Sequence, residues 1–231
     1  MKRFVVLCLL MPPLLAASGS ELFREDFRDL SRWKQVLFPK IPRHTQYSAL
    51  SDGETTFLKA VSDDSASLLV YKQVFNPYDY PRARWRWKVD NVLTRADLRT
   101  KEGDDVPIRV YIAFAYDPKR AGILERAQYE AVRLIYGEYP PHSSLTYCWS
   151  SEVYPRDIIT SAYTARAKMI LLEQGQAKVG AWVAEQVHII ADYRRAFGAD
   201  PPEKATIGIM NDSDNTHGAA TSYITDIAVF R

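Results

Sequence analysis

The sequence is poor in cysteine and in excess charge. Its 231 residues include two cysteines, Cys8 and Cys148, and 30 Lys and Arg residues against 28 Asp and Glu residues, which gives a formal net charge of +2. So few cysteines provide no disulfide framework, so packing must stabilise the fold. The small net charge argues against nucleic acid as a partner, because a nucleic-acid-binding domain is expected to be strongly basic.

The chain also lacks the motifs of several common enzyme classes. It has no Gly-x-Ser-x-Gly element, no phosphate-binding loop, no dinucleotide fingerprint and no His-x-x-x-His pair. These absences argue against the commonest serine hydrolases, P-loop nucleotide hydrolases, Rossmann enzymes and paired-histidine zinc sites. What remains is an ordinary globular composition, 47% hydrophobic and 25% charged. No cofactor is implied with certainty.

Long apolar runs are missing except at the start of the chain. There the basic residues Lys2 and Arg3 precede the mostly apolar residues 4–15, and small residues follow at 16–18. This layout is typical of a secretory signal peptide, and the Pro12-Pro13 pair would break a membrane-spanning helix of about 20 residues. We therefore expect residues 1–18 to be a signal peptide.

Removal of the signal peptide would leave residues 19–231 as one periplasmic or secreted domain without membrane insertion. The loss of Lys2 and Arg3 leaves 28 basic and 28 acidic residues, so the mature domain has no net charge. Cys148 becomes its single thiol. Because it lies in the apolar run Leu145–Trp149, we expect it to be buried and inert.

Apolar and polar residues alternate with a period of two along much of the chain, which is typical of strands. The expected strands cover residues 55–60, 68–71, 82–89, 108–116, 168–172, 206–210 and 222–230. Residues 173–176 are expected to form a hairpin turn. Helical spacing is expected over residues 122–136, and a short helix over residues 192–197 that ends at Gly198. Together these elements predict a mostly β fold, an antiparallel β-sandwich of the jelly-roll or concanavalin-like type, with one or two short helical inserts.

The alternation is clearest in residues 82–89. Ala83, Trp85, Trp87 and Val89 fall on one face, and Arg82, Arg84, Arg86 and Lys88 fall on the other. Because each indole can bury about 150–250 Å² of surface, the apolar face is expected to lie in the core. Four cations cannot be buried unpaired. Their face is therefore solvated, paired with carboxylates, or a groove for an anionic ligand.

Several blocks of the sequence occur together in a recognisable order. They are Trp85–Val89, Gly103–Asp105, Leu145–Trp149, Asp192–Arg194 and Ile207–Thr216. In these blocks the chain resembles an exported bacterial family of uncharacterised proteins, domain of unknown function 3047. The resemblance supports the architecture and implies no established activity.

The chain departs from the pattern of that family at a few positions. Asn211, Ser213 and His217 stand where the family usually has Thr, Thr and Gly, and Val187-His188 stands where an Arg-Asn pair is expected. A function that depends on that arginine is therefore not expected here.

The segment after the strand at 206–210 is rich in oxygen ligands. Asp212, Asp214 and Asn215 are candidate ligands of Ca²⁺, which takes six to eight oxygens from carboxylates, amides and carbonyls. The segment is not an EF-hand, because His217 stands where that motif needs glycine. The alternative is a tight turn whose side chains bond to its own backbone.

A second acidic pair, Asp104 and Asp105, precedes a strand that carries Arg109 and Tyr111 on its polar face. If this strand paired with the one at 82–89, Arg84 and Arg86 would join that face. Carboxylates beside arginine could bond sugar hydroxyls, or one could act as general acid or base if burial raised its pKa. The alternative is an ordinary loop whose carboxylates pair with the basic face.

Three functions are compatible with these patterns. The leading hypothesis is binding of a carbohydrate or anionic glycan through a polar, cationic sheet face. In this hypothesis Arg84, Arg86 and Arg109 contact anions, and Tyr111 and Trp149 offer stacking surface.

A third possibility is a structural or partner-binding envelope protein, whose basic face should be blocked by salt bridges or by the helix at 122–136. Ligand identity and oligomeric state stay open.

The second hypothesis is a polysaccharide hydrolase or lyase. Its candidate catalytic residues are Asp104 or Asp105 with Asp214 or His188, since Gln186-Val187-His188 resembles the Gln-x-His element of jelly-roll alginate lyases. The other strand motifs of those lyases do not occur in this sequence. A hydrolase would need two carboxyl groups about 5–5.5 Å or 6.5–9.5 Å apart. The sequence leaves it uncertain whether the protein is an enzyme.

Overall fold

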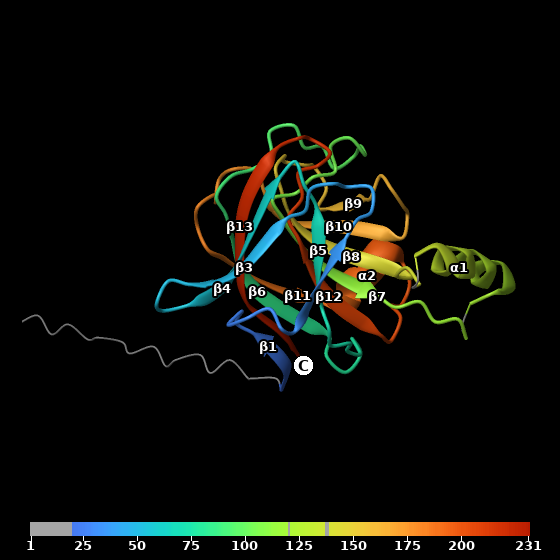
Figure 1. The fold of residues 1–231 in the computed structure, drawn as a ribbon. Coiled ribbons are helices and arrows are strands. Elements are labelled where there is room, and N and C mark those ends of the chain that lie inside the picture. Colours follow the sequence, from blue (N-terminus) through green and yellow to red (C-terminus); the bar gives the residue numbers. More distant parts are fainter. Residues whose placement is uncertain (1–19, 120, 137–138) are drawn as a thin grey trace, which may run out of the picture.

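Two β-sheets pack face to face in a sandwich (Figure 1). The computed structural model describes residues 20–119, 121–136 and 139–231. The first sheet contains β1 (Glu21–Glu25), β3 (Gln46–Ser51), β4 (Thr56–Asp63), β6 (Arg82–Val89), β11 (Val183–His188) and β13 (Ala219–Phe230). The second contains β2 (Trp33–Leu37), β5 (Ser67–Tyr71), β7 (Ile108–Phe114), β8 (Ser143–Ser150), β9 (Ile158–Thr160), β10 (Ala167–Gln174) and β12 (Ala205–Met210).

The strand order confirms the predicted mostly β sandwich. The first sheet runs β11-β6-β13-β4-β3, with β1 also beside β13, and the second runs β2-β5-β12-β7-β8-β10-β9. One pair departs from the antiparallel prediction, because β8 and β10 are parallel. The expected hairpin at 173–176 is wrong, since β10 and β11 belong to different sheets. Gly175, with φ +69°, instead starts the crossing between them.

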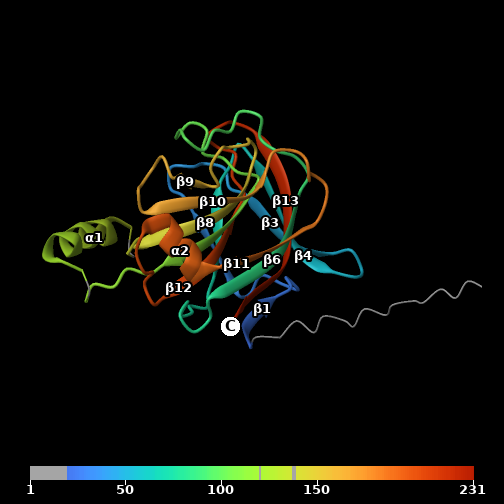
Figure 2. The ribbon, with the colours of Figure 1, turned by 180° about the vertical axis from the view of Figure 1, so that it is seen from behind.

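Both predicted helices form, with differences. The first, α1 (Ile123–Tyr136), projects away from the sandwich in two opposite views (Figures 1 and 2). Leu124 of its expected apolar face is 74% exposed. The second, α2 (Ile189–Phe197), begins three residues earlier than expected and ends at Gly198. Neither helix in the described part of the chain has the length and apolarity needed to cross a bilayer. The expected signal peptide, residues 1–18, lies outside the described residues.

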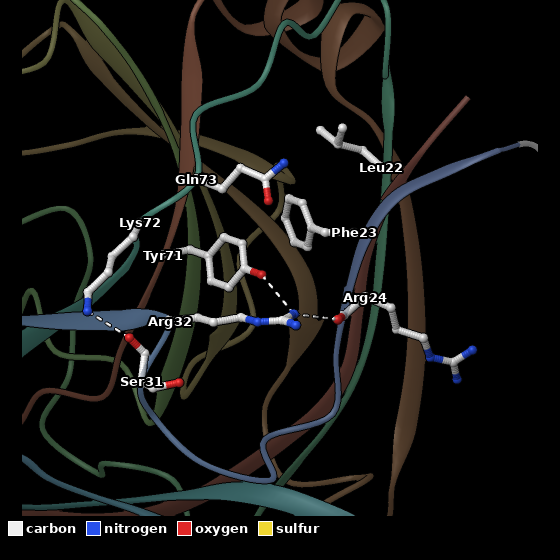
Figure 3. Close-up of a pocket in the computed structure, with 8 residues that line it drawn as sticks. All are labelled: Leu22, Phe23, Arg24, Ser31, Arg32, Tyr71, Lys72 and Gln73. Atoms are coloured by element: carbon white, nitrogen blue, oxygen red, sulfur yellow. Dashed lines mark hydrogen bonds between the residues drawn. The ribbon is translucent and has the colours of Figure 1, made fainter.

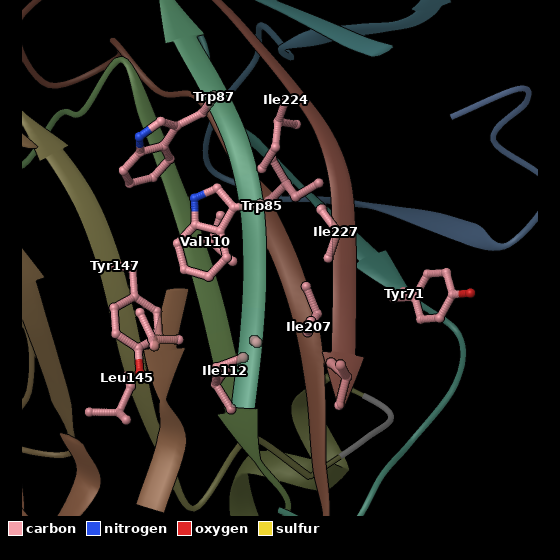
Figure 4. Close-up of a cluster of buried hydrophobic side chains, with 14 of the residues drawn as sticks. Tyr71, Trp85, Trp87, Val110, Ile112, Leu145, Tyr147, Ile207, Ile224 and Ile227 are labelled. Carbon is pink, nitrogen blue, oxygen red and sulfur yellow. The ribbon is translucent and has the colours of Figure 1, made fainter. Parts of the chain in front are cut away.

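The indoles of β6 lie in the core between the sheets, as the alternation predicts (Figure 4). Trp85 lies 5.5 Å from Tyr147 and Trp87 lies 6.1 Å from Trp149, measured between ring centroids. All four side chains are almost fully buried. Because strand side chains alternate, this core face fixes the cations of β6 on the outer face of the first sheet.

The predicted neighbour of β6 is wrong. β6 pairs with β11 and β13, whereas β7 pairs with β8 and β12 in the other sheet. Ile108 and Val110 of β7 are fully buried in the core, so Arg109 and Tyr111 point to the outer face of the second sheet. The cations of β6 and the polar face of β7 therefore lie on opposite outsides of the sandwich, and no common hollow joins them.

Candidate functional site

A cavity of about 540 Å³ lies on the outer face of the second sheet. Four neighbouring strands form its floor: β12 with Met210, β7 with Arg109 and Tyr111, β8 with Thr146, and β10 with Ala167 and Met169. Its rim comes from three loops, which contribute residues 38–41, Ser161 with Tyr163, and Asp212 with Asp214 and Asn215. Asp104 also lines it. The structure therefore brings together the two acidic segments that the sequence analysis treated separately.

Arg109 forms the centre of the polar part of this cavity. Its Nε donates to Asp212 Oδ1 at 3.0 Å, and Nη2 donates to the other oxygen of the same carboxylate. Nη1 donates to Asp104 Oδ1 at 3.1 Å, and Nη2 also donates to the Asp104 carbonyl oxygen at 2.9 Å. Burial opposes the charge of this guanidinium, but the carboxylate of Asp212, followed by Tyr111 and Asp104, raises the pKa of Arg109 well above its ordinary value. Arg109 therefore ties the acidic segments together, and four of its five N–H donors are used by Asp104 and Asp212.

Asp105 stabilises the loop at 212–216 from beneath. It is fully buried, and its two carboxylate oxygens accept the backbone N–H groups of Asn215 at 3.3 Å and Thr216 at 2.6 Å. A buried carboxylate that accepts backbone donors fixes a loop, in keeping with the predicted turn. Asp105 therefore positions Asp214 and does not reach the cavity itself.

Asp214 is the carboxylate best placed to meet a ligand. It is half-buried, lines the cavity and forms no ion pair with any residue in the described ranges. Burial, and then repulsion from Asp105, raise the pKa of Asp214 above its ordinary value. Its carboxyl group therefore keeps its proton to a higher pH than an ordinary aspartate does.

Three carboxylates of this site could hold a metal ion. Oxygen atoms of Asp105, Asp212 and Asp214 lie within 4.8 Å of one another. Two of these residues were predicted as Ca²⁺ ligands. The third predicted ligand, Asn215, donates its amide N–H to the Tyr163 hydroxyl at 3.0 Å, and Asp105 joins the cluster as a carboxylate that was not predicted as a ligand.

Other predicted site residues lie elsewhere. Trp149 is fully buried between the sheets and donates its indole N–H to the Gly175 carbonyl oxygen at 3.2 Å, so it offers no stacking surface. His188 ends β11 in the first sheet and caps α2 by accepting the Ala191 N–H at 3.3 Å. It therefore forms no pair with Asp214 on the opposite face. Asp104 is 7% exposed and bonded to Arg109, which leaves it poorly placed for acid or base catalysis.

Arg84 and Arg86 lie on the outer face of the first sheet. Arg84 pairs with Glu21, and Arg86 lies 3.5 Å from Asp226, each in a partly exposed position. Exposed ion pairs of this kind contribute about 0–1 kcal/mol, so the pairing leaves both cations accessible to other anions. The helix α1 does not cover this face (Figure 2).

The sequence analysis did not predict several residues that shape the cavity. Tyr163, which is 55% exposed, and Phe38 supply aromatic rings from irregular loops, where no periodicity marks them. Met169 and Met210 lie on predicted strands. Their side chains point into the cavity only because β10 and β12 belong to the second sheet, and the sequence does not show to which sheet a strand belongs.

A second hollow, of about 670 Å³, lies at the edge of the sandwich beside β1 and β5 (Figure 3). Its cations are bonded to protein oxygens. Arg32 donates to the Tyr71 hydroxyl at 3.3 Å and to the Arg24 carbonyl at 3.4 Å, and Lys72 donates to the Ser31 carbonyl at 2.6 Å. None of the site residues that the sequence analysis predicted lines this hollow.

Residues 31–228 match a sequence family described as protein of unknown function, DUF3047. The chain belongs to this family. No curated protein sequence is detectably similar to this DUF3047 chain.

Several solved structures share the fold at low identity. The family 11 carbohydrate-binding module of cellulase Lic26A-Cel5E of Clostridium thermocellum aligns with a TM-score of 0.46 and 11% identity, over 93% of this chain and 95% of that chain. The cellulose-induced protein Cip1 aligns at 0.45 and 10%, over 90% and 96%. The lectin from Bauhinia forficata, in complex with GalNAc, aligns at 0.42 and 14%, over 91% and 98%. Similarity at this level concerns the sandwich alone.

Two departures from the DUF3047 pattern gain a structural explanation. His217 has φ +53°, a left-handed conformation that glycine adopts without steric cost, which accounts for the glycine of the family pattern. His188 stands where the pattern has Asn, and it caps α2 through its ring nitrogen as an Asn side chain would through its oxygen. Both substitutions are therefore compatible with the backbone conformation at these two positions.

Proposed function

We propose that this DUF3047 protein binds a carbohydrate in the cavity on the outer face of the second sheet. The observation that carries the proposal is the meeting of Phe38, Tyr111 and Tyr163 with the oxygen acceptors of Asp214 and Asn215 around one hollow. A sugar ring presents apolar C–H faces, which stack on aromatic rings, and hydroxyl groups, which donate to carboxylates and amides. Binding sites for small ligands commonly combine an apolar lining with a few convergent polar groups.

The charge of the cavity favours a neutral sugar over an anionic one. The carboxylates of Asp104, Asp212 and Asp214 line it, with Asp105 beneath, and they are opposed by the buried Arg109 and by Lys40 on the rim. An anionic glycan would meet like charge here, which costs binding energy. The cationic face that the sequence analysis predicted for an anionic glycan lies on the first sheet. We therefore propose a neutral saccharide as the ligand of the cavity on the second sheet.

The proposal extends to Ca²⁺ at the cluster of Asp105, Asp212 and Asp214. Three carboxylates suit this hard cation, and the remaining oxygens would come from the backbone, water or sugar hydroxyls. Arg109 competes, because it already occupies both oxygens of Asp212. A rise in the melting temperature with Ca²⁺ relative to EDTA, lost in Asp214→Asn, is expected. Equal melting temperatures with Ca²⁺ and EDTA would remove Ca²⁺ from the proposal.

Calorimetric titration with a panel of neutral oligosaccharides tests the carbohydrate site. One of them should bind, and Asp214→Asn and Tyr163→Ala should each weaken that binding at least tenfold. Leu50→Ala is the control, because it removes an exposed apolar side chain from β3 of the opposite sheet. The proposal fails if none of the oligosaccharides binds at millimolar concentration, or if the two cavity variants bind like the unmodified protein.

A further inference from the structure

Three aromatic side chains meet on the outer face of the first sheet, away from the cavity. They are Phe57 of β4, Tyr223 of β13 and Trp182, the residue before β11. Their ring centroids are 6.1 Å apart for Phe57 and Trp182, 5.7 Å for Phe57 and Tyr223, and 6.4 Å for Trp182 and Tyr223. All three are half-buried. We call these three residues the aromatic platform.

Cations surround the aromatic platform. Lys88 Nζ lies 4.2 Å from the Tyr223 ring centroid and 5.7 Å from that of Trp182, and Arg86 Cζ lies 5.4 Å from that of Trp182. In the strand register, Tyr223 lies between Lys88 on β6 and Lys59 on β4. Residues directly opposite in a sheet share a face. The platform therefore has a positive group on each side.

Protein carboxylates neutralise these cations only weakly. Lys88 is 4.0 Å from Asp90 and Arg86 is 3.5 Å from Asp226, both at the long end of ion-pair distances. The Arg86 side chain is 43% exposed. Pairs of this kind contribute little to stability, so a ligand anion can displace them at small cost.

We propose that this face is a second binding site, which takes a linear acidic polysaccharide. A sugar ring of such a chain would stack on Trp182 and Tyr223 while its carboxylate contacts Lys88 and Arg86. The cations of β6 continue beyond the platform to Arg84 and Arg82, at every second residue, which spaces them by about 6.6–6.8 Å. An extended ligand with repeated negative charge can follow that row.

The charge count favours an acidic glycan over nucleic acid. The outer face carries Arg24, Lys59 and the four cations of β6, and it also carries Glu21, Asp90 and Asp226. Its excess positive charge is therefore small, whereas binding to duplex DNA depends mainly on neutralising many backbone phosphates with Lys and Arg. The inference does not depend on the carbohydrate cavity, because the two sites lie on opposite outsides of the sandwich.

Trp182 provides a direct probe of the site. The other four tryptophans, Trp33, Trp85, Trp87 and Trp149, are at most 5% exposed, so acrylamide quenching of the accessible indole reports on the platform. Titration with oligogalacturonate should change the emission and protect Trp182 from acrylamide. Affinity should fall as salt increases, because charge drives part of the binding.

Variants decide whether the platform carries the binding. By calorimetry, Arg86→Gln combined with Lys88→Gln should weaken oligogalacturonate binding at least tenfold, and Trp182→Ala should do the same. Lys34→Gln, which removes an exposed lysine from β2 in the other sheet, should leave it unchanged. The proposal is overturned if oligogalacturonate does not bind at millimolar concentration, if the platform variants bind it normally, or if single-stranded DNA binds more tightly.

Discussion

Two interacting glutamates, one on each sheet, should make the free energy of unfolding decrease as the pH rises from mildly acidic to mildly basic values. Glu185 of β11 is half-buried, and Glu173 of β10, on the facing sheet, is 9% exposed. Glu173 pairs with Lys178 at 2.6 Å, whereas Glu185 Oε1 is buried without a hydrogen-bond partner among the described residues. Burial, and then repulsion from Glu173, raise the pKa of Glu185 from 4.5 to about 7.

The sign of the effect follows from proton uptake. Between pH 4.5 and 7 the folded state keeps the proton of Glu185 while the unfolded state has lost it, so the free energy of unfolding decreases as pH rises through this window. The full shift would correspond to about 3 kcal/mol, and solvent screening of this half-buried group reduces the effect to about 1–2 kcal/mol. The loss is nearly complete about one pH unit above the folded-state pKa of Glu185, near pH 8.

The substitution Glu185→Gln removes the titrating group while keeping its shape. Urea unfolding followed by tryptophan fluorescence should show the variant more stable than the unmodified protein by about 1–2 kcal/mol at pH 8 and nearly equal to it at pH 4.5. Glu54→Gln, at an exposed position, is the control and should show no such difference. Equal pH dependence in Glu185→Gln and the unmodified protein would refute the reasoning.

Three further predictions concern the core, the buried ion pairs and the cap of α2. Trp87→Ala should lower the free energy of unfolding by about 3–5 kcal/mol in urea unfolding, because the fully buried indole packs on Trp85 and Trp149; a loss under 1 kcal/mol would contradict the packing. Arg109→Met should cost about 3–5 kcal/mol by the same assay, since it leaves the carboxylates of Asp104 and Asp212 buried and unpaired; a neutral effect would show that Arg109 does not hold them. His188→Ala should cost about 0.5–1 kcal/mol in calorimetric melting, and His188→Asn should not, because Asn restores a capping acceptor; equal effects of the two would exclude the cap.

The sequence predicted local features of the fold well where alternation is strict. The residues of β6 alternate without exception between apolar and cationic, and its bounds and buried face follow from that pattern. β8 hides the same signal, because Thr146 and Cys148, which face away from the core, are also buried, beneath the cavity and the neighbouring loops. Because both faces of β8 are buried, its sequence does not show that Trp149 faces the core.

The sheet to which each strand belongs could not be predicted, because it depends on contacts between distant residues. The pairing of Met210 with Arg109 brings Asp212 next to the acidic pair at 104–105, and no local pattern encodes it. The acidic segments were therefore recognised as candidates while their convergence was not. The placement of Arg84 and Arg86 beside Arg109 was wrong for the same reason.

Amide chemical-shift mapping with a neutral oligosaccharide tests the main functional idea most directly. The signals of Tyr111, Tyr163, Asp214 and Asn215 should move together as saccharide is added, while those of the first sheet stay in place. Movement confined to β4, β6 and β13, or unchanged spectra up to millimolar saccharide, would contradict a sugar site in this cavity.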